Sequence, residues 1–403
     1  MQVPDDRPFD KRRPELVEAL RAQLGYVTWD RNDPTGGNVY NQAIVAELRR
    51  LGMDVWLYAL AGPWPAGDAA SHDQLARALG EAPVCLVDGI VACGAPDVIG
   101  AAVAAGHLIT IVLHLPISDE LGLEPSRRER YAALEARTVH AASGVLCPSR
   151  WSAAEVSRRY GRGDVGVAVP GVTPAAVARG SEDAGSAHII SVASLTPTKD
   201  QLTLIRALTQ LTDLPWTATL VGSDRANPDY AARVRAVIGG AGLGARIRVP
   251  GLLVDEQLDR EWDTADLLVL PSRIETYGLV IGEALARGIP AVVSAGTGAV
   301  EALQQGITSN SEATPGTAVQ AGDPPSLASV LRSWLTEPAL RQAWRQAALA
   351  RRDTLPGWQQ TAGAVLEHLE RLSNRPSTPV GSLPVSPPTP QLARQPSTPC
   401  SPS

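Results

Sequence analysis

The feature that most constrains the fold is a regular alternation of short apolar runs with helical patterns, and it occurs twice along the chain. One helical segment, 38–51, places Ile44, Leu48 and Leu51 on a single face. Such alternation is typical of parallel sheets built from βαβ units. The first set of strand candidates comprises 25–29, 54–60, 84–90, 108–115, 144–149 and 165–171. We therefore expect a doubly wound α/β domain over residues 24–171.

The pattern restarts after a segment rich in Gly, Ser, Pro and acidic residues, 172–187, which we interpret as a linker. A second set of strand candidates comprises 188–195, 217–223, 246–251, 266–272, 291–295 and 316–322. It predicts a second doubly wound domain over 188–356. Residues 1–23 form an N-terminal extension, and residues 374–403 contain too much Pro and Ser to pack, so we expect a disordered tail.

The composition narrows the class of protein. The 403 residues are 44% hydrophobic and 19% charged, and no apolar run reaches the roughly 18 residues of a membrane span. The N-terminus lacks the apolar core of a secretory signal, and the four cysteines form no CxxC pair or disulfide framework. A net charge of -6 argues against non-specific nucleic-acid binding. We expect a cytoplasmic protein with no metal site formed by its thiols.

Two glutamates, Glu275 and Glu283, flank the start of a predicted helix. The run "DLLVLPS" reads as a buried strand, "RIETYG" as a loop, and "LVIGEALARG" as a helix closed by Gly288. Ligands of open α/β sheets bind at the carboxyl ends of strands, and a helix N-terminus near Gly278 favours phosphate. The two carboxylates could hold the diols of a sugar and of a ribose. The alternative is that Glu283 is a solvated helix residue and Glu275 a helix-start acid, and for two isolated glutamates the residues alone favour this structural explanation.

The stretch "PSRIETYGLVIGEALARGIP", preceded by "ADLLVL", resembles the E-x7-E signature of family 4 retaining glycosyltransferases. That resemblance implies the GT-B fold, in which two Rossmann-like domains face a cleft. It assigns Glu275 to the hydroxyls of a donor sugar and Glu283 to a nucleotide ribose, and it gives the backbone of Tyr277, Gly278 and Leu279 to the sugar and pyrophosphate. The segment 357–373 resembles the family's C-terminal helix, which returns to the first domain.

Lys199 lies in "SVASLTPTKDQLTLIRAL", where a strand ends in a turn that leads into a helix. Only two of the 36 basic residues are lysines, and a compact ammonium suits a pyrophosphate, although a surface lysine is the plain alternative. The resembled family has G-R-L-x-x-x-K-G here. Ser194 occupies its Arg position, and Ala193 and Asp200 replace its glycines. Either Arg273 substitutes for the missing cation, or Lys199 and the helix N-terminus act alone.

The first domain offers two candidates for the donor site. Gly36 and Gly37 follow the first strand, where they would let backbone approach a ligand, and Asn38 could cap the next helix. In the resembled family this loop faces the diphosphate, which favours Gly37. His114 ends the fourth strand and resembles the family's histidine that hydrogen-bonds the donor sugar. No role is expected for His107 or His140.

Together with these features, the resemblance to family 4 enzymes implies a retaining hexosyltransferase that uses a UDP- or GDP-sugar and needs neither cofactor nor metal. The sequence does not identify the acceptor, which could be a glycan, a lipid or a small molecule, and a lipid acceptor would imply peripheral membrane contact. Three alternatives stay open: a nucleotide-sugar epimerase, a catalytically silent binding partner suggested by Ser194, and a nicotinamide enzyme. A nicotinamide enzyme is disfavoured, because no G-x-G-x-x-G follows the first strand of either domain. Glu301, after a Gly-rich loop, is a weaker site candidate.

Overall fold

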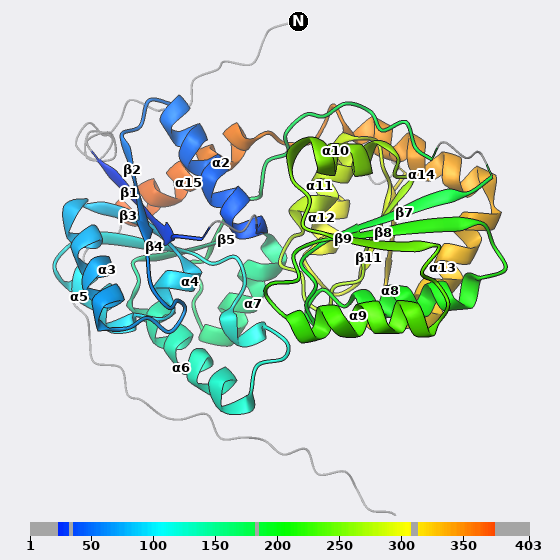
Figure 1. Ribbon diagram of the computed structural model, residues 1–403. Helices are drawn as coiled ribbons and strands as arrows, with labels where there is room; N and C mark the ends of the chain where they lie inside the picture. The colour runs from blue at the N-terminus through cyan, green and yellow to red at the C-terminus, as the bar shows by residue number, and fades with distance from the viewer. Residues whose placement is uncertain (1–22, 32–34, 182–184, 308–312, 375–403) are drawn as a thin grey trace, which may run out of the picture.

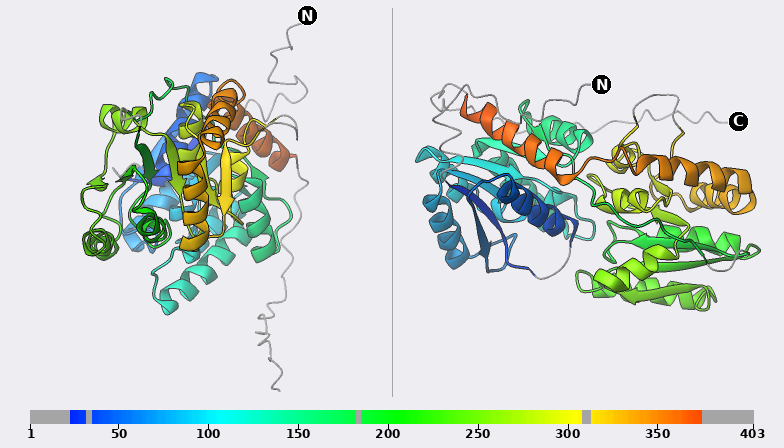
Figure 2. Two further views of the ribbon diagram at one scale, coloured as in Figure 1. Left: turned by 90° about the vertical axis from the view of Figure 1, so that its right-hand side faces the viewer. Right: turned by 90° about the horizontal axis from the view of Figure 1, so that it is seen from above.

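The two predicted α/β domains are both present in the computed structural model, which describes residues 23–31, 35–181, 185–307 and 313–374 (Figure 1). They lie side by side, and the C-terminal helix crosses back over the first domain (Figure 2). The polar N-terminal extension and the Pro/Ser-rich tail fall outside the described residues, except at their inner ends. Within the described part of the chain, no helix combines the length and apolarity needed to cross a membrane.

The first domain is built on a six-stranded parallel sheet of order β2-β1-β3-β4-β5-β6. Its strands are β1 (Leu24–Trp29), β2 (Val55–Leu60), β3 (Val84–Asp88), β4 (Leu108–Val112), β5 (Gly144–Cys147) and β6 (Gly166–Val167). Its helices are α2 (Gly36–Arg50), α3 (Ala69–Glu81), α4 (Gly89–Ala92), α5 (Pro96–Ala104), α6 (Pro125–Ala141) and α7 (Arg150–Tyr160), with a 3-10 turn η1 (Ile117–Asp119). The direction of winding reverses between β1 and β3, so the carboxyl ends of these strands form the ligand-binding position of such a sheet.

The second domain has another six-stranded parallel sheet, of order β12-β11-β10-β7-β8-β9, which is the Rossmann arrangement. Its strands are β7 (Ala187–Val192), β8 (Trp216–Val221), β9 (Ile247–Gly251), β10 (Leu267–Leu270), β11 (Ala291–Ser294) and β12 (Gly316–Val319). Its helices are α8 (Gln201–Leu208), α9 (Pro228–Gly240), α10 (Asp255–Asp263), α11 (Leu279–Ala286), α12 (Ala299–Leu303), α13 (Pro324–Thr336) and α14 (Pro338–Arg351), with a 3-10 turn η2 (Thr209–Leu211). Here the reversal falls between β7 and β10.

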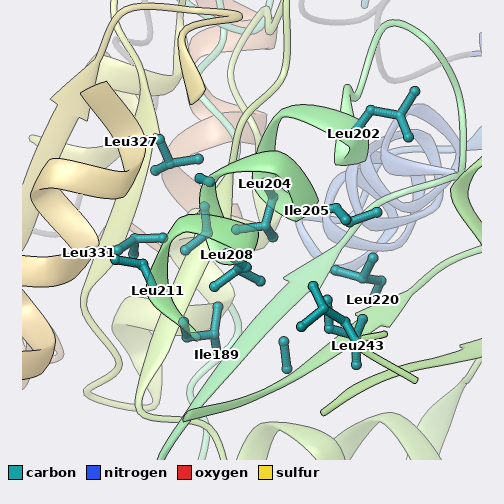
Figure 3. Packing of buried hydrophobic residues seen from close by; sticks show 14 of the residues in the cluster. Ile189, Leu202, Leu204, Ile205, Leu208, Leu211, Leu220, Leu243, Leu327 and Leu331 are labelled. Atoms are coloured by element: carbon teal, nitrogen blue, oxygen red, sulfur yellow. The ribbon is translucent and has the colours of Figure 1, made fainter. Parts of the chain in front are cut away.

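Both sheets are buried on two faces, which explains why their strands read as nearly continuous apolar runs. In β7 the neighbours Ile189 and Ile190 point into different hydrophobic clusters, as the two-residue period of a strand requires. Ile189 meets leucines of α8 and α13, which interdigitate on one face (Figure 3). Helices α10, α11 and α12 cover the other face (Figure 1).

The last helix, α15 (Trp358–Ser373), belongs to the core of the first domain although it follows the second in sequence. Its residues Val365, Leu366 and Leu369 are buried in the cluster that also contains Tyr26 of β1 and Ile44 of α2. The chain therefore crosses between the domains twice, once through the segment after β6 and once before α15. The two domains are therefore joined by two covalent chain connections.

We expect Leu369→Ala to lower the free energy of unfolding by about 2–4 kcal/mol, because it removes a fully buried side chain and leaves a cavity under α15. Urea denaturation followed by circular dichroism measures this. Glu367→Ala, two residues away on the exposed face of the same helix, is the matched control and should change stability little. Equal effects of the two variants would show that α15 does not pack on the first domain.

Candidate functional site

Lys199 and Glu275 are brought together by the strand order of the second sheet. Lys199 follows β7 and Glu275 follows β10, and these two strands are hydrogen-bonded neighbours at the point where the winding reverses. The Nζ of Lys199 lies 2.6 Å from Oε2 of Glu275, which also accepts a hydrogen bond of 3.1 Å from the Ser272 hydroxyl. The Glu275 carboxylate is buried, and Lys199 is partly exposed. The pair thus places one cation and one acid at the carboxyl edge of the sheet.

Arg273, one of the two alternatives for replacing the missing arginine, is bonded to Asp200. Its Nε donates to Oδ2 of Asp200, which also accepts from the Thr203 hydroxyl at 2.7 Å. The guanidinium lies against Gly322, where a side chain of any other residue would collide with it. Ser194 contributes a backbone contact, since its carbonyl accepts from the Gln201 amide at 3.0 Å. Arg273 therefore carries no unpaired charge toward Lys199.

The N-termini of α11 and α2 lie close to each other across the domain boundary. Gly278 precedes α11 with φ of 87°, a left-handed conformation that glycine adopts without strain. Leu279, the first residue of α11, packs against the core of the first domain, and a Cβ on Gly36 would lie 3.7 Å from it. The side chain of Tyr277 is fully buried. Two helix N-termini, each with free N–H groups and partial positive charge, therefore meet at one place.

The cap of α2 differs from the prediction. The helix begins at Gly36, and the Thr35 hydroxyl caps it by accepting from the Asn38 backbone N–H at 3.2 Å. Asn38, the expected cap, lies inside the first turn. The sequence pattern places the start of this helix too late, because two adjacent glycines are typical of a loop, whereas both are helical here.

Glu283 has a carboxylate without a hydrogen-bond or ion-pair partner among the described residues. It lies on α11, which is followed by Arg287 as its C-cap, but that guanidinium bonds the backbone carbonyl of Glu283 and the carboxylate of Asp259. Burial raises the pKa of Glu283 above its ordinary value, with Arg287 opposing and Asp259 adding to the shift. An acid kept partly desolvated without a partner is a candidate for ligand binding.

His114 follows β4 and packs against the first turns of α2. Its Nε2 lies 2.7 Å from Oδ1 of Asn41, and its ring makes an edge contact with Tyr40 at 5.0 Å between centroids. A Cβ on Gly37 would lie 3.0 Å from the imidazole, so this helix approaches the ring closely only because the residue is glycine. Burial lowers the pKa of His114, although nearby Asp88 opposes this shift. The ring is therefore neutral near pH 7.

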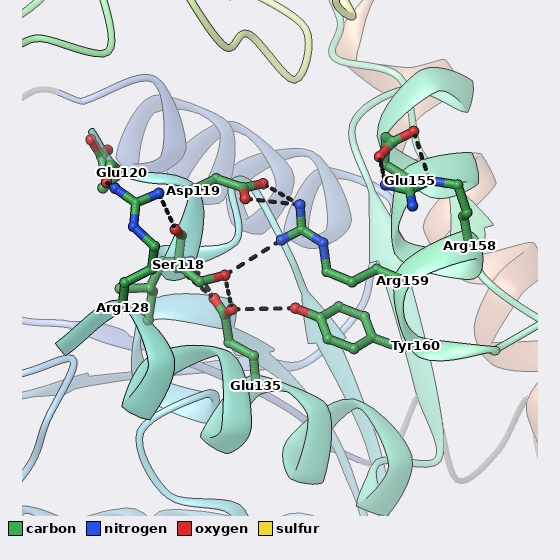
Figure 4. Close-up of polar contacts among 10 residues, drawn as sticks. Ser118, Asp119, Glu120, Arg128, Glu135, Glu155, Arg158, Arg159 and Tyr160 are labelled. Carbon is green, nitrogen blue, oxygen red and sulfur yellow. Dashed lines mark hydrogen bonds and ion pairs between the residues drawn. The ribbon is translucent and has the colours of Figure 1, made fainter. Parts of the chain in front are cut away.

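The loop that follows His114 reaches the second domain. A buried acid, Glu135 of α6, accepts the backbone N–H of Ile117 and the hydroxyls of Ser118 and Tyr160, at 2.5 and 3.2 Å for the hydroxyls (Figure 4). The loop then extends to Glu120, whose carboxylate accepts from the Thr198 hydroxyl at 2.7 Å. Because Thr198 precedes Lys199, the two candidate regions are in direct contact.

A second contact between the domains joins the N-terminus of α7 to Glu301, which lies in the first turn of α12; we refer to it as the α7–Glu301 contact. The Glu301 carboxylate accepts the backbone N–H groups of Arg150 and Trp151, both at 3.2 Å, at the N-terminus of α7. The hydroxyl of Ser149, the N-cap of α7, donates to the carbonyl of Thr276 at 2.5 Å. Thr276 follows Glu275 directly, so this contact reaches the same loop as the Lys199 pair.

Sequence reasoning did not find Asn41, Asp88, Ser149 or Glu135. Asp88 carried a usable signal, because it ends a fully buried strand beside the reversal point of the first sheet. Ser149 carried a local signal as the N-cap of α7, but its bond to Thr276, like the contacts of Asn41 and Glu135, joins residues separated in sequence. Among the described residues no group of three His, Cys, Asp or Glu side chains is arranged to hold a metal ion.

The family described as glycosyl transferases group 1 matches residues 175–351. D-inositol 3-phosphate glycosyltransferase 1 of Catenulispora acidiphila is 32% identical over 145 residues, which are 36% of this chain and 32% of that protein. D-inositol 3-phosphate glycosyltransferase of Streptomyces avermitilis is 30% identical over 287 residues, which are 66% of this chain and 59% of that protein. The chain thus spans less than two thirds of the length of either relative.

Solved structures share the two-domain GT-B fold. Sucrose-phosphate synthase from Thermosynechococcus elongatus superposes with a TM-score of 0.68 at 19% identity, over 87% of this chain and 99% of that one. Anabaena HepE in complex with UDP and glucose gives a TM-score of 0.66 at 18% identity, over 86% of this chain and 99% of that one. At these identities the likeness concerns the fold.

We expect Glu283→Gln to raise the melting temperature at pH 7. The folded-state pKa of Glu283 is raised, so folding favours the protonated acid, and its ionised form lowers stability as the pH rises through that pKa. The gain should vanish below the unfolded-state pKa of about 4.3, as measured by calorimetry from pH 7 to pH 4. Glu256→Gln, an exposed acid on α10, is the control. An increase in melting temperature that does not depend on pH would contradict a raised pKa for Glu283.

We expect Glu301→Gln to loosen the α7–Glu301 contact, because the amide presents N–H toward the helix N–H groups that the carboxylate accepts. The loss should be roughly 1–2 kcal/mol of interdomain stabilisation. Small-angle X-ray scattering should then give a larger radius of gyration than for the wild type. Glu155→Gln removes the same charge from the exposed side of α7 and should leave the scattering unchanged. Identical curves for Glu301→Gln and wild type would exclude a role in domain closure.

Proposed function

Because the chain carries a group 1 glycosyltransferase domain at residues 175–351, we propose that it is a retaining hexosyltransferase that uses a nucleotide diphosphate sugar. The observation that carries this proposal is the meeting of the Lys199–Glu275 pair with the N-termini of α2 and α11. Positive charge and free N–H groups gather there beside a buried carboxylate, as a diphosphate attached to a sugar requires. We propose that this reaction takes place in the cytoplasm.

In this proposal the donor replaces the Lys199–Glu275 ion pair. The Lys199 ammonium turns to the diphosphate, and the Glu275 carboxylate then accepts hydrogen bonds from sugar hydroxyls. The backbone N–H groups from Gly278 to Leu279 bind phosphate oxygens, and Glu283, whose carboxylate has no partner among the described residues, accepts the ribose hydroxyls. The lysine and the two helix N-termini neutralise the leaving diphosphate, so the proposed reaction needs no metal ion.

The first domain contributes His114 and Gly37 to the sugar side. His114 is neutral, so its free ring nitrogen can accept a hydrogen bond from a sugar hydroxyl. Gly37 keeps the first turn of α2 close to both the ring and the diphosphate. Glu275 then positions the sugar rather than attacking it, and the acceptor approaches the anomeric carbon from the side that the diphosphate leaves. That stereochemical course follows from the resemblance to retaining enzymes.

We propose a UDP-sugar as donor and a small phosphorylated polyol as acceptor. The donor follows from HepE, which was solved with UDP and glucose, and the acceptor from the relatives named for D-inositol 3-phosphate. These two compounds are therefore the first to test, with GDP- and ADP-sugars as competitors for the donor site.

A second candidate is a catalytically silent protein that binds nucleotide sugars. It is favoured by the two ion pairs of this region, because Arg273 is bonded to Asp200 and Lys199 to Glu275, so each of these cations already has a carboxylate partner. This candidate predicts donor binding without turnover. A nucleotide-sugar epimerase would instead isomerise the donor with no acceptor present.

We expect Lys199→Met to weaken UDP binding tenfold to a hundredfold, because a charge-assisted hydrogen bond contributes roughly 1.5–3 kcal/mol. Isothermal titration calorimetry with UDP, GDP and ADP measures this, and affinity for uridine should not change. Arg233→Met removes an exposed cation from α9 and serves as the control. Unchanged UDP affinity in Lys199→Met would remove Lys199 from the site.

Product analysis of the wild type distinguishes the proposed transferase from an epimerase and from a catalytically silent binding protein. Transfer to D-inositol 3-phosphate or another polyol phosphate supports the proposed reaction. Isomerised sugar in the absence of acceptor would identify an epimerase, and binding without either product would identify the silent partner.

A further inference from the structure

A buried chain of polar groups lies behind His114 and connects it to the carboxyl ends of β1 and β3. Asn41 is its centre. The amide Nδ2 of Asn41 lies 2.6 Å from Oδ2 of Asp88, and its Oδ1 lies 2.6 Å from the Tyr26 hydroxyl and 2.7 Å from His114 Nε2. Asn41, Asp88 and Tyr26 are all buried. Each hydrogen must therefore point in a definite direction, because water cannot satisfy a wrongly oriented group.

Asp88 fixes the direction of this chain. An ionised carboxylate only accepts hydrogen bonds, and Oδ1 of Asp88 already accepts the backbone N–H of Ile90 at 3.0 Å, as the cap of α4. Its Oδ2 therefore requires the NH2 group of Asn41. The amide oxygen of Asn41 must then face His114 and Tyr26, and it can accept from both.

His114 Nε2 consequently has to carry a hydrogen. The Tyr26 hydroxyl can donate to the same oxygen, because burial and the charge of Asp88 raise its pKa and keep it protonated. The other ring nitrogen, Nδ1, has no hydrogen-bond partner among the described residues, and His114 as a residue is partly exposed. In a neutral imidazole with hydrogen on Nε2, Nδ1 is an acceptor.

We propose that Asp88 and Asn41 are positioning residues that hold His114 in the Nε2–H tautomer, so that Nδ1 is presented to the donor as a hydrogen-bond acceptor. Asp88 determines the orientation of the Asn41 amide, and that orientation determines which nitrogen of the His114 imidazole carries the hydrogen. The functional part of this inference rests on the proposed sugar-nucleotide site, whereas the tautomer itself does not.

The test is the effect of Asp88→Asn on the His114 tautomer. The new amide keeps its oxygen for Ile90 N–H and turns its NH2 toward Asn41, whose own amide must then reverse. His114 Nε2 then faces a donor, and the hydrogen moves to Nδ1. The two residues have the same shape, and asparagine caps helices as well as aspartate does, so the fold should be retained.

Long-range ¹H–¹⁵N spectra of histidine-labelled protein at pH 7 read the tautomer directly. The sequence has 6 histidines, and loss of one signal in His114→Gln assigns the relevant ring. We expect the Nε2–H pattern in the wild type and the Nδ1–H pattern in Asp88→Asn. Thr28→Val removes a hydroxyl that lies 3.4 Å from both Asp88 and Asn41, without reversing either group, and should keep the wild-type pattern.

Binding provides the second readout. In Asp88→Asn the affinity for the UDP-sugar should fall about tenfold while the affinity for UDP is unchanged, because only the sugar reaches His114. An Nδ1–H or doubly protonated His114 in the wild type would overturn the inference even if Asp88→Asn failed to fold, and so would a folded Asp88→Asn that kept the Nε2–H pattern. If the tautomers behave as expected but no nucleotide sugar binds the wild type, the proposed function fails and the assignment of the tautomer stands.

Discussion

The arrangement of the candidate site depends on the α7–Glu301 contact. A helix N-terminus has backbone N–H groups without internal partners, and here an acid from the other domain accepts two of them. Ser149, which caps the same helix, bonds the backbone beside Glu275. The contact thus fixes the position of the two sheets relative to each other and the conformation of the 273–278 loop together. A change in the distance between the domains must disturb the loop that carries Glu275.

The second bridge, from Glu120 to Thr198, acts in the same way on the other side of the site. It links the loop after His114 to the turn that carries Lys199. Glu135 organises that loop from within the first domain, so its position is set by a buried acid rather than by solvent. The loops that carry Lys199 and Glu275 are therefore each attached to the opposite domain by a hydrogen bond one residue away. If the donor binds as proposed, this geometry couples its binding to the approach of the domains, because both depend on the same two loops.

The sequence was sufficient to predict the two sheets, the GT-B fold and the resemblance to family 4 glycosyltransferases, and these predictions are confirmed. They depend on local periodicity and on one contiguous motif, which a single sequence contains. The orientation of the Asn41 amide could not be predicted in this way, because Asn41, Asp88 and His114 lie on separate elements that meet only in the folded protein. The cap of α2 was wrong for a different reason: two glycines at a helix start read locally as a loop.

The departures from the family pattern around Lys199 are connected with one another. Asp200 has φ of 47°, a left-handed conformation that favours the glycine found there in the resembled family. Its carboxylate holds Arg273, and the guanidinium fits against Gly322. A free arginine would add one positive charge near the diphosphate, whereas an Asp–Arg pair adds none. In the proposed donor site, Ser194 stands where the resembled family has arginine, so we expect the helix N-termini of α2 and α11 to stabilise more of the phosphate charge than in a site with two free cations. Because partial charges at helix ends act only over about one turn, this site should depend strongly on the contact between the domains that brings the two ends together.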